Sequence, residues 1–228
     1  MRRFFYTPDI QEEKEEQGQI LITGTEAHHI CKVLRMQPGD KAELFDSQGG
    51  IITAQLAESK PKQAVFIVLS RSIEVDTSTP LILAQAVLKG KKMDLVVQKA
   101  TELGVQRFQP VLTRYCERLG GIGQQMQRWQ RIILEACKQC RRPIPMELAE
   151  PVPLGELPHL PLLGEYGEIC KLMPWEKEGT RPFSAVMSAA AVPGNAQPVL
   201  VLIGPEGGFH PSEVRFAEEA GFSTISLG

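Results

Sequence analysis

The sequence lacks any apolar run approaching the roughly 18 to 20 residues of a membrane-spanning helix, so we expect no transmembrane segment. The charged beginning, Met1–Phe5, is not followed by the apolar stretch of a signal peptide. The five cysteines are an odd number without the spacing of a disulfide framework, which is typical of a reducing compartment. These absences predict a cytoplasmic protein that folds without disulfides or a membrane.

Clustered metal ligands are also lacking. His28 and His29 are adjacent, so their side chains point in different directions, and no further ligands lie near them in the sequence. Cys137 and Cys140 have C-x-x-C spacing, but they fall inside a helical pattern and no second pair accompanies them. We therefore expect no metal site.

The net charge of −2 conceals an uneven distribution of charge. Residues 89–142 carry 12 basic and 4 acidic side chains, whereas residues 143–228 carry 4 basic and 11 acidic ones. Within the basic block, a helical pattern over 124–142 gathers apolar residues on one face. Its opposite face carries Arg128, Arg131, Lys138 and Arg142. The block is the electrostatic footprint expected for a polyanion, although a solvated surface rich in lysine and arginine would look the same.

Two kinds of pattern divide the chain. Over 1–74, short runs separated by turns predict strands of a small β-barrel domain. The polar segment Asp76–Pro80 marks a linker, and beyond it strand and helix patterns alternate, which predicts an α/β domain with a parallel sheet over 75–228. Strands are expected at 41–45, 51–57, 64–69, 81–88, 108–112, 169–173, 199–203 and 224–227, helices at 94–103, 124–142 and 211–220, and a proline-rich connection at 143–163.

The most informative stretch is the apolar strand 199–203, which stops at Gly204-Pro205-Glu206-Gly207-Gly208 before the helix over 211–220. In an open α/β sheet, ligands bind outside the carboxyl ends of the strands, and glycines let the backbone approach a ligand closely. The loop lacks the Gly-Lys-Ser/Thr of a P-loop and the G-x-G-x-x-G of a dinucleotide turn. It is a candidate binding loop, although a plain strand-to-helix turn would use glycines in the same way.

The string Ile203–Phe209 resembles a motif of the knotted SPOUT-class RNA methyltransferases. The closest resemblance is to the family that methylates uridine N3 in 16S ribosomal RNA. It extends to Gln98–Val105, to residues between Trp129 and Pro145, and to a string from His28 to Asp46 that is similar to the family's PUA-like amino-terminal domain. The combination of Lys-Ala-Thr-Glu-Leu-Gly-Val with Gly-Pro-Glu-Gly-Gly is more specific than either motif alone.

The resemblance implies a SPOUT trefoil-knotted parallel-sheet domain preceded by a small PUA-like β-barrel, assembled as a homodimer. It also implies S-adenosylmethionine as cofactor, lying against three strand-end loops. The residues that match these loops are Leu172, Met173, Pro174, Leu202, Ile203, Gly204, Glu206, Gly207, Gly208, Leu227 and Gly228. The family continues with an arginine-containing segment and a final helix, so part of the third loop is expected beyond Gly228. His210 replaces the family's usual serine or threonine helix cap, so we expect a weaker cap.

The chemistry that the resemblance implies requires N3 of uracil to lose a proton and to align with the methyl-sulfur bond. Arg114 matches a family arginine and is predicted to face the substrate as a cation that stabilises the developing anion. Glu102 is a catalytic candidate, although it could simply pair with Lys99 on an exposed helix face. Glu206 is a second carboxylate, for which we favour a role in holding the loop by hydrogen bonds over one in catalysis.

The expected partner is 16S ribosomal RNA, either naked or in the small ribosomal subunit. Predicted contacts to its phosphates are Arg2, Arg3, Arg35, Lys89, Lys91, Lys92, Arg118, Arg128, Arg131, Lys138, Arg141 and Arg142. Two other functions stay open. One is a different SPOUT activity, such as ribose 2′-O-methylation, which the position of the methyl group would distinguish. The other is a non-catalytic RNA-binding or assembly factor, which would fail to bind S-adenosylmethionine.

Overall fold

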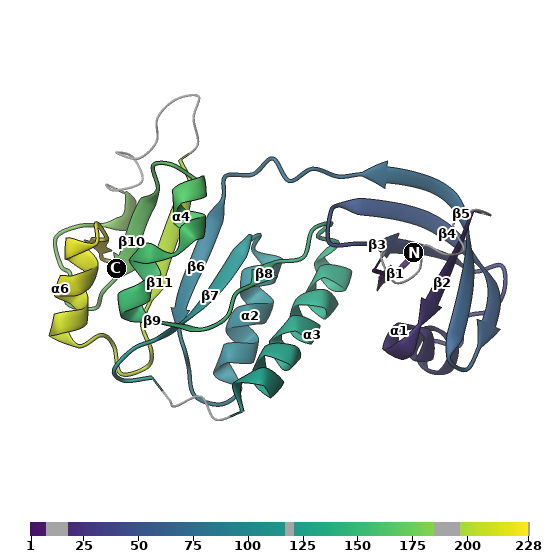
Figure 1. The fold of residues 1–228 in the computed structure, drawn as a ribbon, viewed down its shortest axis with the longest axis horizontal. Helices are drawn as coiled ribbons and strands as arrows, with labels where there is room; N and C mark the ends of the chain where they lie inside the picture. The colour runs from purple at the N-terminus through teal and green to yellow at the C-terminus, as the bar shows by residue number, and fades with distance from the viewer. Residues whose placement is uncertain (8–17, 117–120, 185–196, 228) are drawn as a thin grey trace. The chain divides into compact units, whose positions relative to one another are not determined.

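A five-stranded sheet forms the first unit of the computed structural model, which describes residues 1–7, 18–116, 121–184 and 197–227 (Figure 1). The strand order is β1-β3-β4-β5-β2, with β1 parallel to β3 and the other neighbours antiparallel. The bounds are β1 Arg2–Phe5, β2 Gln19–Thr23, β3 Lys41–Phe45, β4 Gly50–Lys60 and β5 Gln63–Ile73. The three strands predicted at 41–45, 51–57 and 64–69 are confirmed, whereas β1 and β2 were missed.

The core of this unit is built from apolar side chains on one face of these strands, among them Phe4, Leu44 and Phe66, each at most 1% exposed. The short helix α1 (Gly24–His28) and the π-helical turn η3 (His29–Val33) add Ala27 and Ile30 to the core. The unit consists of Met1–Thr77 together with Cys137–Pro145, a segment that the sequence prediction had placed in the second domain.

The second unit, Ser78–Ala136 with Met146–Gly228, contains a parallel sheet in the order β12-β10-β11-β6-β7-β8, with β9 also pairing with β7. Every strand pair of this sheet is parallel. The parallel α/β arrangement predicted from the sequence is therefore confirmed. The bounds are β6 Leu81–Ala86, β7 Arg107–Leu112, β8 Glu147–Leu148, β9 Val152–Pro153, β10 Cys170–Pro174, β11 Val199–Ile203 and β12 Ser223–Ile225.

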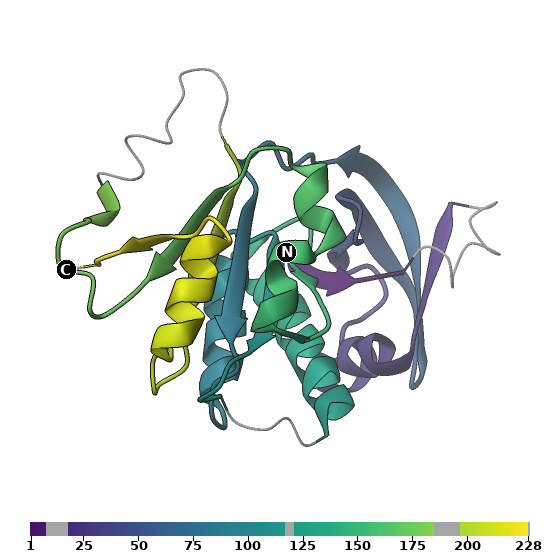
Figure 2. The same cartoon turned by 60° about the vertical axis from the view of Figure 1, so that its left-hand side comes forward.

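Helices accompany this sheet as the alternating pattern predicted. In Figures 1 and 2, α2 (Lys92–Glu102) and α3 (Ile122–Cys140) run beside β6 and β7. Leu200 and Leu202 of β11 pack with Val214 and Ala217 of α6 (Pro211–Glu219) in one core cluster. Residues 143–163 are not a plain connection, because they also contain a 3-10 helix η4 (Leu154–His159) and the start of α4 (Pro161–Glu165). Leu154, Leu157 and Leu163 are buried in the same cluster, which stabilises this stretch despite its prolines.

Candidate functional site

The loops at the carboxyl ends of β6, β7, β10 and β11 share one edge of the parallel sheet, because parallel strands all end on the same side. The loop after β11 begins at Gly204, where an added Cβ would lie 2.9 Å from Cε2 of Phe209. Gly208 has φ +69°, a conformation that side chains rarely adopt. These two glycines are therefore required for the shape of the loop itself, whether or not a ligand binds there.

Gln85 is the polar residue that ties this loop to the sheet. It lies on β6, is 3% exposed, and its Nε2 donates to the carbonyls of Ala86 at 3.0 Å and Gly204 at 3.3 Å. A buried amide needs such partners, since leaving it unpaired costs about 1–3 kcal/mol. The sequence analysis missed this residue, although a glutamine inside an otherwise apolar strand was a signal for it.

Glu206 is held from the loop that follows β6. Its Oε1 accepts from the backbone N–H of Lys89 at 3.4 Å and forms an ion pair with Nζ of Lys92 at 2.9 Å. The Lys92 ammonium is the main cause that lowers the pKa of the Glu206 carboxyl below its ordinary value. These contacts support the prediction that Glu206 holds the loop, and they place Lys89 and Lys92 beside it, with Lys91 exposed on the same loop.

The loop after β7 packs against the same glycine-rich loop. The backbone N–H of Arg114 donates to Oε1 of Glu213 at 2.7 Å, and Nη1 of Arg114 lies 3.1 Å from Nε2 of His210. Tyr115 stands edge-on to the His210 ring at 6.1 Å, and its Cβ would lie 3.3 Å from a Cβ added at Gly207. Arg114 itself is exposed, so its guanidinium is presented at the edge of the sheet where the candidate binding loop lies.

His210 caps α6 despite the absence of a hydroxyl side chain. Its Nδ1 lies 3.2 Å from the backbone N of Ser212, and Oε2 of Glu213 accepts from the backbone N–H of His210 at 2.9 Å. The two contacts form a capping box in which an imidazole replaces the usual Ser or Thr oxygen. The sequence analysis placed His210 at this cap, but it missed the contact of His210 with Arg114 and the role of Glu213.

The loop after β10 is anchored to β12. Leu172 and Met173 are fully buried on β10, and the N–H of Trp175 donates to the carbonyl of Ile225 at 3.0 Å. Glu178 accepts from the N–H and hydroxyl of Thr180, from the N–H of Arg181 and from the hydroxyl of Thr224 on β12. The backbone hydrogen bond from Thr180 is the leading cause that lowers the pKa of Glu178 to about 2. Glu178 thus fixes this loop beside β12.

We expect the substitution Glu178→Gln to lower the thermal unfolding temperature at pH 7, because an amide cannot accept all of these hydrogen bonds. The folded-state pKa of about 2 lies below the ordinary 4.5, so the stabilisation by Glu178 is present above about pH 4.5. It is lost as the pH falls from there toward 2. Thermal unfolding from pH 7 to pH 3 should therefore show the difference between wild type and variant shrinking. A Glu168→Gln variant, at an exposed position, is the control, and an equal shift in both variants would contradict the role of Glu178.

The remaining predicted cofactor residues lie at the same edge or just beyond it. Ile203 is 36% exposed at the end of β11, and Leu227 follows β12 with 73% of its surface exposed. Pro174 ends β10 and is half-buried. Gly228 and Arg118 lie outside the described residues.

Glu102 lies at the wrong edge of the sheet for catalysis. It is the last residue of α2, which starts near the carboxyl end of β6 and runs back about 15 Å toward the beginning of β7. Its carboxylate accepts from Gln98 and pairs with Lys99 at 2.6 Å, and the hydrogen bond from Lys99 is the main cause that lowers its pKa. The simpler interpretation, an ion pair on an exposed helix face, is the one the structure supports.

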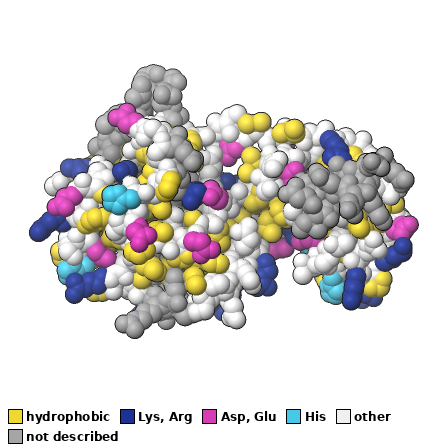
Figure 3. All heavy atoms as spheres, in the orientation of Figure 1, with side chains coloured by type: hydrophobic (Ala, Val, Ile, Leu, Met, Phe, Trp, Pro, Cys, Tyr) yellow, Lys and Arg dark blue, Asp and Glu magenta, His cyan; other side chains and the backbone are white. Residues whose placement is uncertain are grey.

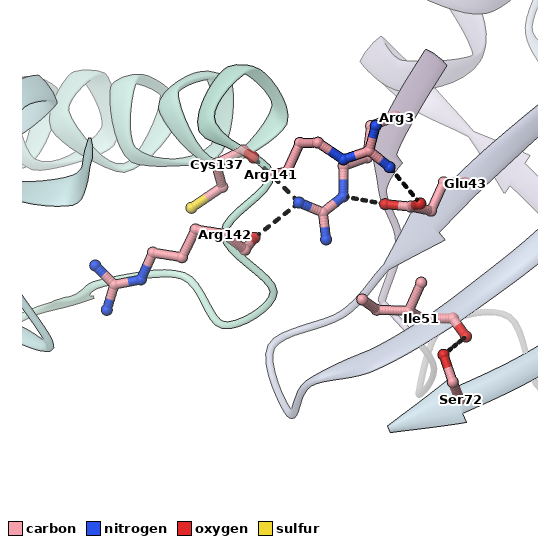
Figure 4. Close-up of polar contacts among 7 residues, drawn as sticks. All are labelled: Arg3, Glu43, Ile51, Ser72, Cys137, Arg141 and Arg142. Atoms are coloured by element: carbon pink, nitrogen blue, oxygen red, sulfur yellow. Dashed lines mark hydrogen bonds and ion pairs between the residues drawn. The ribbon is translucent and has the colours of Figure 1, made fainter. Parts of the chain in front are cut away.

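Two of the predicted RNA-contacting cations are buried in ion pairs of the first unit. The side chain of Arg3 is only 4% exposed and lies between Glu43 and the carbonyls of Cys137 and Arg142 (Figure 4). The side chain of Lys138 is 6% exposed and pairs with Glu26. Both were predicted as phosphate contacts, and this interpretation is wrong, because both side chains are almost fully buried and are paired with carboxylates.

The other predicted cations divide into paired and exposed side chains. Arg141 pairs with Glu43 at 2.9 Å but keeps 61% of its side chain exposed, and Arg128 pairs with Asp94 while Arg131 contacts a backbone carbonyl. Burial lowers the pKa of Arg142, whose Nε donates to the carbonyl of Ile144. On the face shown in Figure 3, cationic and acidic side chains are interspersed. The excess of positive charge over residues 89–142 is therefore partly neutralised in the folded chain.

Arg2 and Arg35 line a cavity of about 500 Å³ in the first unit. Nη1 of Arg2 donates to the carbonyl of Leu34, and Arg35 has φ 50°, an uncommon conformation for a residue with a side chain. Lys41 also lines the cavity, and Asp40 is the one acidic residue among the lining residues of the described chain. The net positive lining keeps Arg2 and Arg35 as candidates for phosphate contacts.

The described residues contain no group of three or more His, Cys, Asp or Glu side chains that could hold a metal ion. Over the same described ranges, no helix is long and apolar enough to cross a membrane.

Comparison with known proteins yields two family matches. Residues 75–228 match the RNA methyltransferase domain, and residues 22–69 match the RNA methyltransferase PUA domain. Ribosomal RNA small subunit methyltransferase E from Aquifex aeolicus is 32% identical, over 94% of this chain and 78% of that protein. The protein of the same name from Buchnera aphidicola is 30% identical, over 92% of this chain and 82% of that protein. The crystal structure of the Neisseria gonorrhoeae protein of that name, bound to S-adenosyl methionine, is 26% identical with a TM-score of 0.83, covering 100% of this chain and 89% of that one.

Proposed function

We propose that this chain, which belongs to the family of the ribosomal RNA small subunit methyltransferase E proteins, methylates N3 of a uridine in 16S ribosomal RNA. The chain is an RNA methyltransferase with a PUA domain, and its cofactor is S-adenosylmethionine. The observation that carries the proposal is the convergence of Arg114 with the glycine-rich loop at the carboxyl edge of the parallel sheet.

The residues at this edge fit the cofactor. β11, β10 and β12 are neighbours, so their end loops lie side by side, and the glycines after β11 add no side chain of their own to the loop. We assign Leu172 to Pro174, Leu202 to Gly204 and Glu206 to Gly208 to the cofactor site. When bound, S-adenosylmethionine supplies an electrophilic methyl group and needs no metal. Leu227 and Gly228 belong to the same proposed site.

Arg114 supplies the cation of the proposed mechanism. Uracil N3 becomes nucleophilic only after it loses its proton, and the resulting anion spreads charge onto the neighbouring oxygens. A guanidinium placed beside these oxygens favours the anion in the transition state. Arg114 is exposed, carries a fixed charge, and is anchored by its own backbone to Glu213. These properties allow its side chain to meet a large substrate without disturbing the loop.

We assign the RNA contacts to cations of both units that stay exposed. Lys89 and Lys91 lie on the loop beside Glu206, Lys92 begins α2 there, and Arg2 and Arg35 line the cavity of the PUA unit. Lysine and arginine side chains position RNA through its phosphates, whereas the pocket around the reacting base provides specificity. Arg118, Arg128, Arg131, Arg141 and Arg142 remain secondary candidates.

Three further properties follow from the family resemblance and form part of the proposal. The parallel sheet unit contains a trefoil knot of the SPOUT type, the chain acts as a homodimer, and it works in the cytoplasm, where small ribosomal subunits are assembled. The dimer is testable by light scattering of the purified chain across a concentration series. A single species with the mass of one chain, 25.2 kDa, would contradict the dimer.

The function is tested by incubating the chain with methyl-labelled S-adenosylmethionine and small ribosomal subunits that lack the modification, with naked 16S ribosomal RNA in parallel. We expect label in RNA, recovered as N3-methyluridine by nuclease digestion and mass spectrometry. A Gly204→Val variant is the control, because its side chain would collide with Phe209 and distort the loop. Recovery of a 2′-O-methyl nucleoside would contradict the N3 assignment, and RNA binding without binding of S-adenosylmethionine would indicate an assembly factor instead.

A further inference from the structure

His210 makes two sets of contacts that compete for one proton. Its Nε2 lies 3.1 Å from Nη1 of Arg114, and its Nδ1 lies 2.7 Å from Oγ and 3.2 Å from the backbone N of Ser212. A guanidinium can only donate, so the contact with Arg114 requires Nε2 to be an acceptor. A neutral imidazole has one acceptor nitrogen, and Nδ1 must then carry the proton.

The charge of the donor decides between the two tautomers. With the proton on Nδ1, the ring donates to the Ser212 hydroxyl at 2.7 Å and accepts from Arg114 at 3.1 Å, so both of its nitrogens are used. With the proton on Nε2, the ring caps the N–H of Ser212 at 3.2 Å but turns an N–H toward the N–H groups of Arg114. Each tautomer leaves one pair of opposing donors, since the first turns Nδ1–H toward the backbone N–H of Ser212. The first keeps the hydrogen bond from the charged guanidinium, which is about twice as strong as one from a neutral N–H, and is therefore favoured.

We propose that His210 is a positioning residue, which holds the Arg114 guanidinium through its Nε2 lone pair in the Nδ1-protonated tautomer. The proposal rests on the proposed function, in which Arg114 faces the uridine. It assigns to the histidine a task other than accepting from the Ser212 N–H, for which a serine or threonine would suffice. The ring of Tyr115, edge-on to the imidazole at 6.1 Å, restricts its rotation.

The backbone of Arg114 is held by Glu213, whereas its guanidinium contacts His210. The position of the loop and the position of the guanidinium therefore depend on different residues. Oε1 of Glu213 accepts from the Arg114 N–H, so loss of the imidazole frees the guanidinium while the loop stays in place. The groups that face His210 are Arg114 and Tyr115 from the loop after β7, and Ser212 and Glu213 from α6. Protonation of the second ring nitrogen would remove the acceptor and put a cation against Arg114, so the contact exists only while His210 is neutral.

Two substitutions at His210 separate capping from positioning. In His210→Asn the amide oxygen takes the place of Nδ1 and caps α6, but the side chain is too short to reach Arg114. In His210→Gln the amide oxygen takes the place of Nε2 and accepts from the guanidinium without titrating. We expect His210→Asn to lower kcat by up to about 100-fold, the scale for a misplaced reacting group. We expect His210→Gln to recover most of the loss.

The binding constant for S-adenosylmethionine should match wild type in both variants, and His210→Asn, which caps α6, should unfold at no lower temperature than wild type. In an Arg114→Ala background, His210→Asn should cause no further loss of kcat. A loss of the same size in that background, or a wild-type kcat for His210→Asn, would overturn the proposal.

Nitrogen NMR of the imidazole in the cofactor-free chain tests the contact without any activity. We expect a proton on Nδ1 of His210 in wild type and a shift toward the Nε2-protonated tautomer in Arg114→Ala, where Nδ1 is free to cap Ser212. The same tautomer in both would overturn the contact. If the tautomer shifts as expected while no variant, wild type included, methylates RNA, then the contact stands and the proposed function fails.

Discussion

Replacing Arg114 by alanine is expected to lower kcat for RNA methylation by about 100- to 1,000-fold, the scale for removing one group that stabilises charge developing in a transition state. The loss should appear in kcat and in kcat/KM alike, because the guanidinium acts on an anion that the bound uridine does not yet carry. The measurement is single-turnover methylation of small ribosomal subunits at saturating S-adenosylmethionine. Arg114→Lys should retain part of the rate, since it keeps the charge but loses the fork of donors.

The structure makes this substitution interpretable, because the side chain of Arg114 is exposed and its backbone is held by Glu213. The affinity for S-adenosylmethionine should therefore stay at the wild-type value in Arg114→Ala. Arg215→Ala is the matched control, since Arg215 is an exposed arginine on α6 and its loss removes the same charge from the same unit. A comparable loss of kcat in both variants would mean that the net charge of the unit matters and that the position of Arg114 does not.

Much of the candidate site could be predicted from the sequence because its signals are local. The apolar strand that stops at Gly204 and the helix that begins at Pro211 are short-range patterns, and they fix the edge of the sheet at which the loop lies. Arg114 follows the strand β7 by the same logic. The parallel order of the strands then brings these separate loops together, so three local predictions were enough to place one site.

The contacts that decide each side chain's role could not be predicted in this way. Gln85 and Gly204 are 119 residues apart, and Arg114 and Glu213 are 99 apart. Neither strand nor helix periodicity reports which polar groups meet across such separations. Glu102 shows the converse failure, because its place in a family motif indicated importance, whereas the direction of α2 carries it to the opposite edge of the sheet.

Charge counts failed for a related reason. Residues 89–142 carry an excess of eight positive charges over negative ones. Such a count along the chain takes every cation as unpaired, because it cannot report ion pairs with carboxylates from other segments. Lys138 pairs with Glu26, and Arg141 with Glu43, each across about a hundred residues of sequence. Arg3, outside that block, is neutralised by the same Glu43. The basic surface of the folded chain is therefore smaller than its composition predicts.

Replacing Glu43 by glutamine should have the largest effect on stability, a loss of about 3–5 kcal/mol in the free energy of unfolding of the first unit, because it leaves Arg3 buried without a counter-charge. The side chains of Arg3 and Glu43 are 4% and 11% exposed, and Nε of Arg3 lies 2.7 Å from Oε1 of Glu43. That contact is an ion pair and not an aligned hydrogen bond. Arg3 also lies 4.5 Å from the centre of the Phe45 ring, which offers no charge to replace the carboxylate.

The measurement is unfolding in urea, monitored through hydrogen exchange of the β3 and β4 amides, because these amides report on this unit alone. Glu58→Gln is the matched control. Glu58 forms an ion pair with Lys60 on the same strand β4, but both side chains are more than half exposed, so its loss should cost about 0–1 kcal/mol. Similar costs for the two substitutions would contradict a buried charge at Arg3.

The same network explains why the end of α3 folds with the first unit. Arg3 donates to the carbonyls of Cys137 and Arg142, and Arg141, at φ 62°, pairs with Glu43 (Figure 4). Glu43 thus neutralises an arginine from β1 and one from the segment Cys137–Pro145. Arg3→Met combined with Glu43→Leu should recover most of the stability lost in Glu43→Gln, because an apolar pair needs no counter-charge. Hydrogen exchange at Cys137–Pro145 should nevertheless stay faster than in wild type, since methionine cannot donate to those carbonyls.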